Sequence, residues 1–220
     1  MRSNTLKVRI CETFASLQGE STHAGRKCFF IRLSGCNLNC SYCDTGYARD
    51  FDTGSERTLS SLVDEVKASG LTLAEITGGE PLCNPETPEL CAMLLDAGIE
   101  VLIETNGSKP IGALPREVRK ILDCKLPDSG MSEFNCYENY ALLEKHDEVK
   151  FVISSRRDFD FACDVIKKYA LFERTPHLIA SPVWGRVSFA ELSSWVMESP
   201  LPWRMQLQMH KIIWGDLRGV

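Results

Sequence analysis

Short β-rich runs alternate with stretches of helical period along most of this 220-residue chain, and this alternation limits its fold more than any other feature. Residues 58–69, for example, carry apolar residues at helical spacing and are followed by Gly70, a typical helix C-cap. The pattern predicts strands over residues 28–33, 73–77, 99–103, 121–124, 149–154, 177–180 and 204–209. It predicts helices over residues 58–69, 87–97, 115–120, 137–145, 159–170 and 189–197.

Repeated β-α-β units imply a parallel sheet with helices outside it. We therefore expect an α/β fold, an open, partial β/α barrel of about six parallel strands with outer helices, because a closed eightfold barrel needs more strands. No linker, internal repeat or low-complexity tract divides the sequence, which predicts a single domain over residues 1–220. In such sheets the working residues follow the carboxyl ends of the strands.

Composition excludes several classes of function. Hydrophobic residues make up 44% and charged residues 25%, which is typical of a globular chain and not of a disordered one. The net charge of −5 disfavours a nucleic-acid partner. Apolar runs fall well short of the roughly 18 residues that span a bilayer, and no signal-peptide stretch is visible, so we expect a cytoplasmic protein without a membrane partner. In such a protein the ten cysteines are expected to be reduced thiols.

Three of these cysteines are closely spaced. Cys36, Cys40 and Cys43 form a C-x3-C-x2-C pattern directly after the strand expected over residues 28–33. Thiolates bind iron–sulfur clusters and zinc. Three of them can hold a [4Fe–4S] cluster and leave its fourth iron open to a small molecule. A zinc site with a distant fourth ligand and buried structural thiols are the alternatives, although the single C-x2-C pair favours the cluster.

The triplet, with Tyr42 just before its third cysteine, resembles the signature of the radical S-adenosylmethionine (SAM) enzymes. The run Gly78-Gly79-Glu80-Pro81 resembles their second motif, which contacts the amino group of SAM. The resemblance implies that the reduced cluster passes one electron to SAM, which yields methionine and a 5′-deoxyadenosyl radical that takes hydrogen from the substrate. It also implies an electron donor such as flavodoxin or ferredoxin.

Three further segments resemble the 7-carboxy-7-deazaguanine synthases. Residues 12–20 are similar to the pattern E-x-F-x-S-x-Q-G-E-G, with Ser21 in place of the last glycine. Thr45, two residues after Cys43, matches the family's Mg²⁺ ligand, whereas the residues alone favour a threonine that caps a turn. Residues 206–220 resemble the family's Q-x-H-x-x-x-W-G ending, and the spacing of Gln208 and His210 puts both side chains on one face of the expected strand.

This resemblance implies a carbon–nitrogen lyase of queuosine and other 7-deazapurine biosynthesis. The enzyme would convert 6-carboxy-5,6,7,8-tetrahydropterin to 7-carboxy-7-deazaguanine with loss of ammonia. A [4Fe–4S] cluster, SAM used catalytically and Mg²⁺ would be its cofactors. Family members commonly form homodimers, so a homodimer is expected.

The resemblance also assigns site residues, none of them catalytic beyond the cluster-bound SAM. The cluster would be held by Cys36, Cys40 and Cys43, and Mg²⁺ by Thr45. SAM would be bound by Tyr42, Gly78, Gly79 and Glu80. Glu104, Asn106 and Lys125 are added as SAM ligands because they follow expected strands, with a plain turn and a solvated lysine as the alternatives. The pterin would be bound by Leu17, Gln18, Gly19, Arg32, Thr77, Gln208, His210 and Val220. The forked guanidinium of Arg32 suits a substrate carboxylate.

Two other functions fit parts of the sequence. A glycyl-radical enzyme activase shares the triplet and the size but acts on a partner protein, and it needs neither Thr45 nor the pair Gln208 and His210. A zinc or iron–sulfur structural protein has no use for the Gly-Gly-Glu-Pro run and would not bind SAM.

Overall fold

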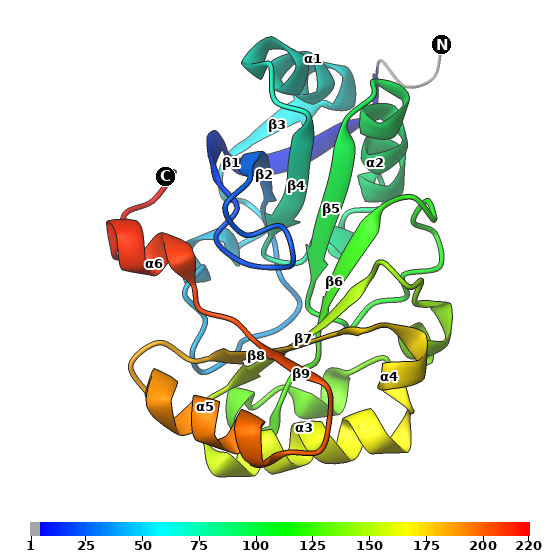
Figure 1. Ribbon diagram of the computed structural model, residues 1–220. Helices are drawn as coiled ribbons and strands as arrows, with labels where there is room; N and C mark the ends of the chain where they lie inside the picture. Colours follow the sequence, from blue (N-terminus) through cyan, green and yellow to red (C-terminus); the bar gives the residue numbers. More distant parts are fainter. Residues whose placement is uncertain (1–4) are drawn as a thin grey trace.

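The computed structural model describes residues 5–220, which form one curved, nine-stranded sheet (Figure 1). The strand order is β3-β1-β2-β4-β5-β6-β7-β8-β9, with β3 and β9 at the two open edges. From β2 to β9 all neighbours pair in parallel, whereas β1 pairs antiparallel with both β2 and β3. The expected open, partial β/α barrel is thus confirmed. Within residues 5–220 no helix combines the length and apolar character needed to cross a membrane.

The strands have the following bounds: β1 Lys7–Leu17, β2 Lys27–Leu33, β3 Ser55–Thr58, β4 Leu73–Gly78, β5 Glu100–Thr105, β6 Arg119–Asp123, β7 Glu148–Ile153, β8 His177–Pro182 and β9 Trp203–Met205. The α-helices are α1 Leu59–Ser69, α2 Thr87–Asp96, α3 Arg156–Lys168, α4 Leu171–Arg174, α5 Phe189–Glu198 and α6 Met209–Trp214. Short 3-10 helices η2 Gly46–Ala48, η3 Pro81–Cys83, η4 Pro127–Ser129, η5 Ser132–Phe134 and η6 Tyr137–Leu142 complete the elements.

Capping explains where α1 begins and ends. The Thr58 hydroxyl accepts a hydrogen bond from the Ser61 N–H at 3.2 Å and so satisfies a free donor of the first turn. At the other end Gly70 adopts φ +71°, the left-handed conformation expected of a C-cap glycine. The other α-helices were also predicted close to their observed positions, apart from α4 and α6, which the pattern did not indicate.

Four expectations were wrong in detail. Residues 115–120 form turns and the start of β6, because Arg119 and Lys120 pair with β5 instead of coiling. Residues 137–145 contain the 3-10 helix η6 and no α-helix. The last strand ends at Met205, so Gln208 and His210 do not share a strand face: Gln208 caps α6, and His210 lies within α6. The strand count also missed β1 and β3, the antiparallel addition at one edge.

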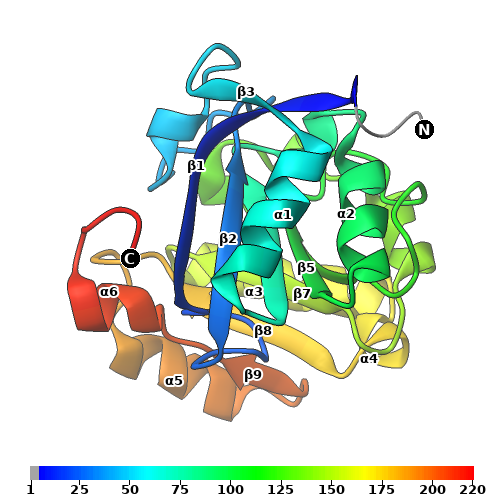
Figure 2. The ribbon, with the colours of Figure 1, turned by 90° about the horizontal axis from the view of Figure 1, so that it is seen from above.

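The sheet separates two layers of side chains. Helices α1 to α5 lie on its convex side, where they bury the main apolar core, and α6 stands apart beside the loop that joins β1 to β2 (Figures 1 and 2). A small apolar cluster of Cys28, Phe30, Leu73, Leu102 and Ile121 closes the concave side at its base. Because strand side chains alternate, the next inward positions toward the carboxyl ends of these strands face the same concave space. Polar and charged residues occupy them.

Candidate active site

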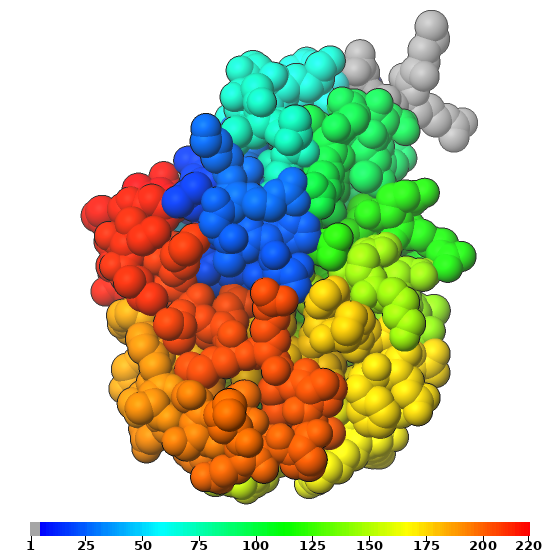
Figure 3. Space-filling view, in the orientation of Figure 1, coloured from blue at the N-terminus to red at the C-terminus, as the bar shows by residue number. Residues whose placement is uncertain are grey.

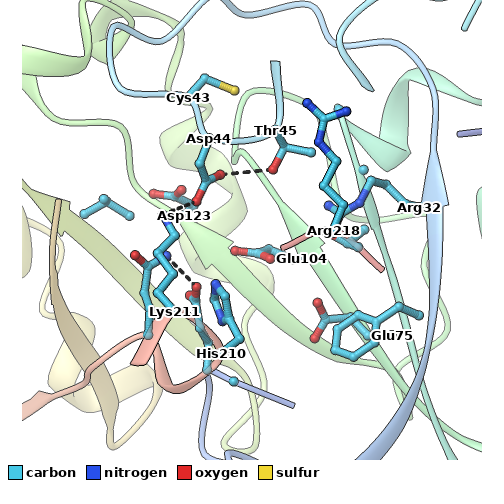
Figure 4. A pocket seen from close by; sticks show the side chains of 18 of the residues that line it. Arg32, Cys43, Asp44, Thr45, Glu75, Glu104, Asp123, His210, Lys211 and Arg218 are labelled. Atoms are coloured by element: carbon cyan, nitrogen blue, oxygen red, sulfur yellow. Dashed lines mark hydrogen bonds and ion pairs between the residues drawn. The ribbon is translucent and has the colours of Figure 1, made fainter. Parts of the chain in front are cut away.

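The concave side of the sheet encloses a cavity of about 540 Å³. This volume is in the range of about 300–1,000 Å³ that is typical of small-molecule and cofactor sites. Its lining combines the carboxyl ends of β2, β4, β5 and β6 with the loop after β1, the cysteine loop after β2 and the C-terminal segment, residues 206–220 (Figure 4). The loop after β1 and the C-terminal segment meet here: the Met209 N–H donates to the Gly19 carbonyl at 3.0 Å, and Figure 3 shows the two segments side by side at the surface.

The cysteine loop places Cys36, Cys40 and Cys43 along one side of the cavity, with Cys43 exposed. Two N–H groups point at the Cys36 sulfur: the Leu38 backbone donates at 3.4 Å and the Asn106 amide at 3.7 Å. Such donors suit a thiolate that ligates an iron–sulfur cluster. Within residues 5–220 no three thiol, imidazole or carboxylate groups converge on a single metal position.

Gly78 and Gly79 allow the end of β4 to approach this loop. A Cβ on Gly79 would lie 2.2 Å from the Gly35 carbonyl oxygen and 2.9 Å from the Cβ of Cys36. At Gly78, with φ +140°, a Cβ would lie 2.1 Å from the Leu33 carbonyl oxygen. The two glycines are therefore needed for backbone packing against the cysteine loop, and both line the cavity.

Glu80 lies beneath the cavity and not in its lining. Its fully buried carboxylate accepts hydrogen bonds from the Thr105 hydroxyl at 2.8 Å, the Asn106 N–H at 2.6 Å and the Leu82 N–H at 2.9 Å. Burial raises the pKa of Glu80, and these donors oppose that effect. The contacts make Glu80 a positioning residue that fixes Asn106 next to Cys36.

Asp123 and Lys125 line the cavity next to the cysteines. The Lys125 ammonium donates to Asp123 Oδ2 at 2.7 Å. Burial lowers the pKa of Lys125, but the charge and hydrogen bond of Asp123 together with Cys40 and Tyr42 outweigh burial and the net pKa is raised, so the ammonium stays charged. Asp123 Oδ1 is buried and has no hydrogen-bond partner among the described residues. An unpaired buried acceptor beside a buried cation fits a ligand that carries both an amino group and a carboxylate, as SAM does.

Three glutamates and one lysine form the floor of the cavity. Lys150, from β7, donates to Glu20 at 2.9 Å and also pairs with Glu104. Burial raises the pKa of Glu20, but Lys150, the Gln208 hydrogen bond and His210 together outweigh burial and hold that pKa below its ordinary value. Burial, reinforced by the Glu104 carboxylate, raises the pKa of the third glutamate, Glu75, well above its ordinary value. The floor therefore favours the charged forms of Glu20 and Lys150 and the uncharged form of Glu75.

The opposite side of the cavity is cationic. Arg32 donates to Glu12 at 2.8 Å and lies near the Phe14 ring, while Arg218 stacks on the Tyr47 ring with its central carbon 3.9 Å from the ring centre. The C-terminal segment is held by side chains: Lys211 pairs with Asp44 at 2.8 Å, and Gln208 donates to Glu20 at 2.9 Å.

The structure brings together nearly all the residues that the sequence singled out. The cavity lining includes the three cysteines, Thr45, Tyr42, Gly78, Gly79, Glu104, Asn106, Lys125, Leu17, Gln18, Gly19, Arg32, Thr77, Gln208, His210 and Val220, and only Glu80 lies outside it. The Thr45 hydroxyl donates to Asp44 Oδ1 at 3.0 Å. Sequence reasoning missed Glu20, Asp44, Glu75, Asp123, Lys150, Lys211 and Arg218. A charged residue inside an otherwise apolar strand was the available signal for Glu75 and Lys150.

The model of the radical SAM superfamily matches residues 30–169, which run from the first parallel strand through the cysteine loop to the end of α3. With its open β/α sheet and its cysteine loop at the carboxyl end of β2, the chain belongs to the radical SAM superfamily. Membership implies a [4Fe–4S] cluster, SAM, a reductant and a small-molecule substrate.

Curated relatives narrow the assignment. The 7-carboxy-7-deazaguanine synthase of Koribacter versatilis is 38% identical over 228 residues, which cover 97% of this chain and all of the relative. The enzyme of the same name from Chlorobaculum tepidum is 38% identical over 222 residues, covering 99% of this chain and all of the relative. A crystal structure of QueE from Escherichia coli shares the fold, with a TM-score of 0.77 at 22% identity over 94% of this chain and 96% of that one. Within the superfamily, this chain is a member of the 7-carboxy-7-deazaguanine synthase family.

Proposed function

We propose that this protein is a carbon–nitrogen lyase that converts 6-carboxy-5,6,7,8-tetrahydropterin to 7-carboxy-7-deazaguanine with loss of ammonia, a step of queuosine and related 7-deazapurine biosynthesis. The observation that carries the proposal is that the loop after β1 and the C-terminal segment share one cavity with the cysteine loop. Gln18, His210 and Val220 line the same cavity as Cys36 and Cys40. An activase that acts on a partner protein does not need the C-terminal segment in its site.

The bound cluster and SAM would supply the radical chemistry, and the chain's own residues bind, orient and shield. Cys36, Cys40 and Cys43 would hold the cluster. Lys125 and the unpaired Asp123 oxygen would bind the carboxylate and amino groups of SAM, with Tyr42, Gly78, Gly79 and Asn106 around them.

The cationic side suits the substrate's carboxylate. Arg32 and Arg218 supply guanidinium groups there, and guanidinium binds carboxylate strongly when water is excluded. Thr45 would add a hydroxyl ligand for Mg²⁺, with Asp44 beside it as a second hard oxygen. Leu17, Gln18, Gly19, Thr77, Gln208 and His210 surround the remaining space, where the ring would lie.

Further properties belong to the same proposal. The chain would act as a single domain and as a homodimer, with flavodoxin or ferredoxin as the electron donor to the exposed side of the cysteine loop. We also propose a cytoplasmic location, because all ten cysteines are free thiols and a reducing compartment keeps them so.

An anaerobic assay tests the proposal. The cluster is reconstituted and reduced, and the protein is incubated with SAM, Mg²⁺ and 6-carboxytetrahydropterin while products are followed by mass spectrometry. The expected result is 7-carboxy-7-deazaguanine without matching consumption of SAM, with a lower rate when Mg²⁺ is omitted. Cleavage of SAM to 5′-deoxyadenosine with no deazapurine would overturn the substrate assignment and favour the activase.

A further inference from the structure

Glu75 is a carboxyl group in an apolar setting on the concave face of β4. It pairs in register with Phe30 on one side and Leu102 on the other, two members of the apolar cluster at the base of the cavity. Its residue is only 3% exposed, yet it lines the cavity and points into it from β4 (Figure 4). Because strand side chains alternate, Glu75 faces the same space as Thr77, which lies two residues nearer the carboxyl end of β4.

Gln18 fixes which oxygen of Glu75 faces the cavity. The side-chain oxygen of Gln18, Oε1, accepts a hydrogen bond from the Glu20 N–H at 3.0 Å, which leaves Nε2 of the same amide as the donor toward Glu75. That donor bonds Glu75 Oε2. Among residues 5–220 this is the one side-chain hydrogen bond to Glu75, so Oε1 remains for another partner.

Burial and the charges around Glu75 favour its protonated form. Glu104 from β5, Glu20 from the loop after β1, Lys150 from β7 and the Cys28 thiol from β2 face it. The hydrogen bonds of the Lys150 ammonium go to Glu20 and Glu104, so three carboxyl groups share one cation that is already paired twice. Burial and the Glu104 charge raise the pKa of Glu75 well above its ordinary value. With Oε2 accepting from Gln18, the proton belongs on Oε1, toward the cavity.

We propose that Glu75 is a specificity-determining residue whose Oε1 hydroxyl donates a hydrogen bond to a carbonyl oxygen or an unprotonated ring nitrogen of a bound heterocycle. This inference rests on the proposed function. It adds the protein group that recognises a hydrogen-bond acceptor on the ring of the bound heterocycle. A neutral carboxylic acid offers one hydrogen-bond donor beside one acceptor, whereas a carboxylate offers acceptors only. The protonation state of Glu75 therefore determines which edge of a heterocycle can hydrogen-bond to it. A ligand lacking that acceptor would leave the hydroxyl unpaired in a buried site.

Two substitutions of Glu75 test whether it acts as a neutral hydrogen-bond donor. Glu75→Gln keeps one donor and one acceptor at the same place and cannot ionise, while Glu75→Leu keeps the volume and removes both. The probe is 6-carboxypterin, a stable fluorescent relative of the proposed substrate, titrated into cluster-loaded protein with SAM under anaerobic conditions. We expect Glu75→Gln to bind it within a few-fold of wild type and Glu75→Leu to bind it roughly 10- to 100-fold more weakly.

A second measurement does not depend on any ligand. Infrared difference spectra of the protein at neutral pH, in H₂O and D₂O, should show the carbonyl band of one buried protonated carboxylic acid in wild type. The band should be absent from Glu75→Gln and Glu75→Leu. Glu89→Gln, at an exposed position on α2, is the matched control and should change neither the infrared band nor the binding.

The outcomes separate the two proposals. If wild type does not bind 6-carboxypterin, the proposed function fails and the inference falls with it. If wild type binds but Glu75→Leu binds equally well, only the role of Glu75 is overturned. Weak binding by Glu75→Gln, equal to that of Glu75→Leu, or no protonated-acid band in wild type, would overturn the neutral-donor role.

Discussion

The cavity has two walls that are built in different ways. The cysteine wall, which consists of the loop that carries Cys36, Cys40 and Cys43 and the Gly78-Gly79 turn, is joined to the sheet by backbone packing. Gly79 leaves no room for a Cβ against Gly35, and the Glu80 carboxylate ties the end of β4 to β5. The C-terminal wall, residues 206–220, is joined near its start by two backbone hydrogen bonds, from Gln206 to Ala180 and from Met209 to Gly19. Its other ties are side-chain contacts, namely Lys211 to Asp44 at 2.8 Å and Gln208 to Glu20 at 2.9 Å.

This difference matches what each wall must do. A cluster site has to hold its ligands at fixed positions, so it is built from groups that cannot move without breaking the sheet. A wall that closes over a substrate has to admit it, and side-chain ion pairs near solvent are weak enough to open. Changes in the first wall should therefore abolish the site, and changes in the second should weaken substrate binding alone.

Removal of a cluster cysteine should have the largest effect. Cys40→Ala leaves two of the three proposed ligands, and we expect it to lose the iron and with it essentially all activity. Iron content and the visible absorption of the reconstituted protein measure this. Cys136→Ala, at a half-buried thiol beside η6, is the control and should keep both. Full iron retention by Cys40→Ala would contradict the cluster assignment.

Gly79→Ala should damage the same wall through its backbone. The new Cβ would lie 2.2 Å from the Gly35 carbonyl oxygen, so the loop or the strand has to shift. Overpacking of this kind costs about 1–3 kcal/mol. We expect a lower free energy of unfolding by that amount in denaturant titration, together with reduced iron content. Gly46→Ala, in the segment just after the three cysteines, is the control, because its Cβ would meet no atom within 4 Å. An equal loss there would argue against the packing explanation.

Lys211→Met should affect only the C-terminal wall. It removes the ion pair with Asp44, whose side chain is half exposed, so the interaction is worth about 1 kcal/mol or less. We expect KM for the pterin to rise roughly 3- to 5-fold with iron content unchanged. Lys67→Met, an exposed change on α1, should leave KM as it is. Iron loss in Lys211→Met would mean that the two walls are not independent.

The two walls also differ in how far they could be predicted from the sequence. The cysteine wall was predicted well because its motifs are local: the triplet follows β2 directly, and the Gly-Gly run ends β4. The C-terminal wall was predicted by residue but not by conformation. Gln208 and His210 were expected on a strand, yet β9 ends at Met205 and α6 begins at Met209, because the segment leaves the sheet edge to bond Gly19.

The floor between the walls was the part that motif reading missed. Glu75, Lys150 and Asp123 come from three different strands, and their proximity follows from the sheet register, which short motifs do not encode. Glu80 shows the converse case. Its motif was recognised and its SAM contact stays a prediction, but the sequence did not indicate that the buried carboxylate also supports Asn106.

Glu75→Gln should produce the smallest effect on ligand binding, and its effect on stability tests the floor between the two walls. Because the folded-state pKa of Glu75 is raised, the folded protein binds more protons than the unfolded chain above the ordinary value of 4.5. The free energy of unfolding of wild type therefore falls as pH rises through that range, by about 1.4 kcal/mol for each unit of pKa difference. The Glu75→Gln variant lacks this pH-dependent loss of stability.

The melting temperature of the variant should therefore exceed that of wild type by a margin that widens from pH 5 to pH 8, measured by thermal unfolding. A margin that stays constant with pH would contradict a buried neutral acid at this position, whereas a widening one would mean that the chain retains a destabilising group in the floor of its site, as expected of a residue kept for binding and not for folding.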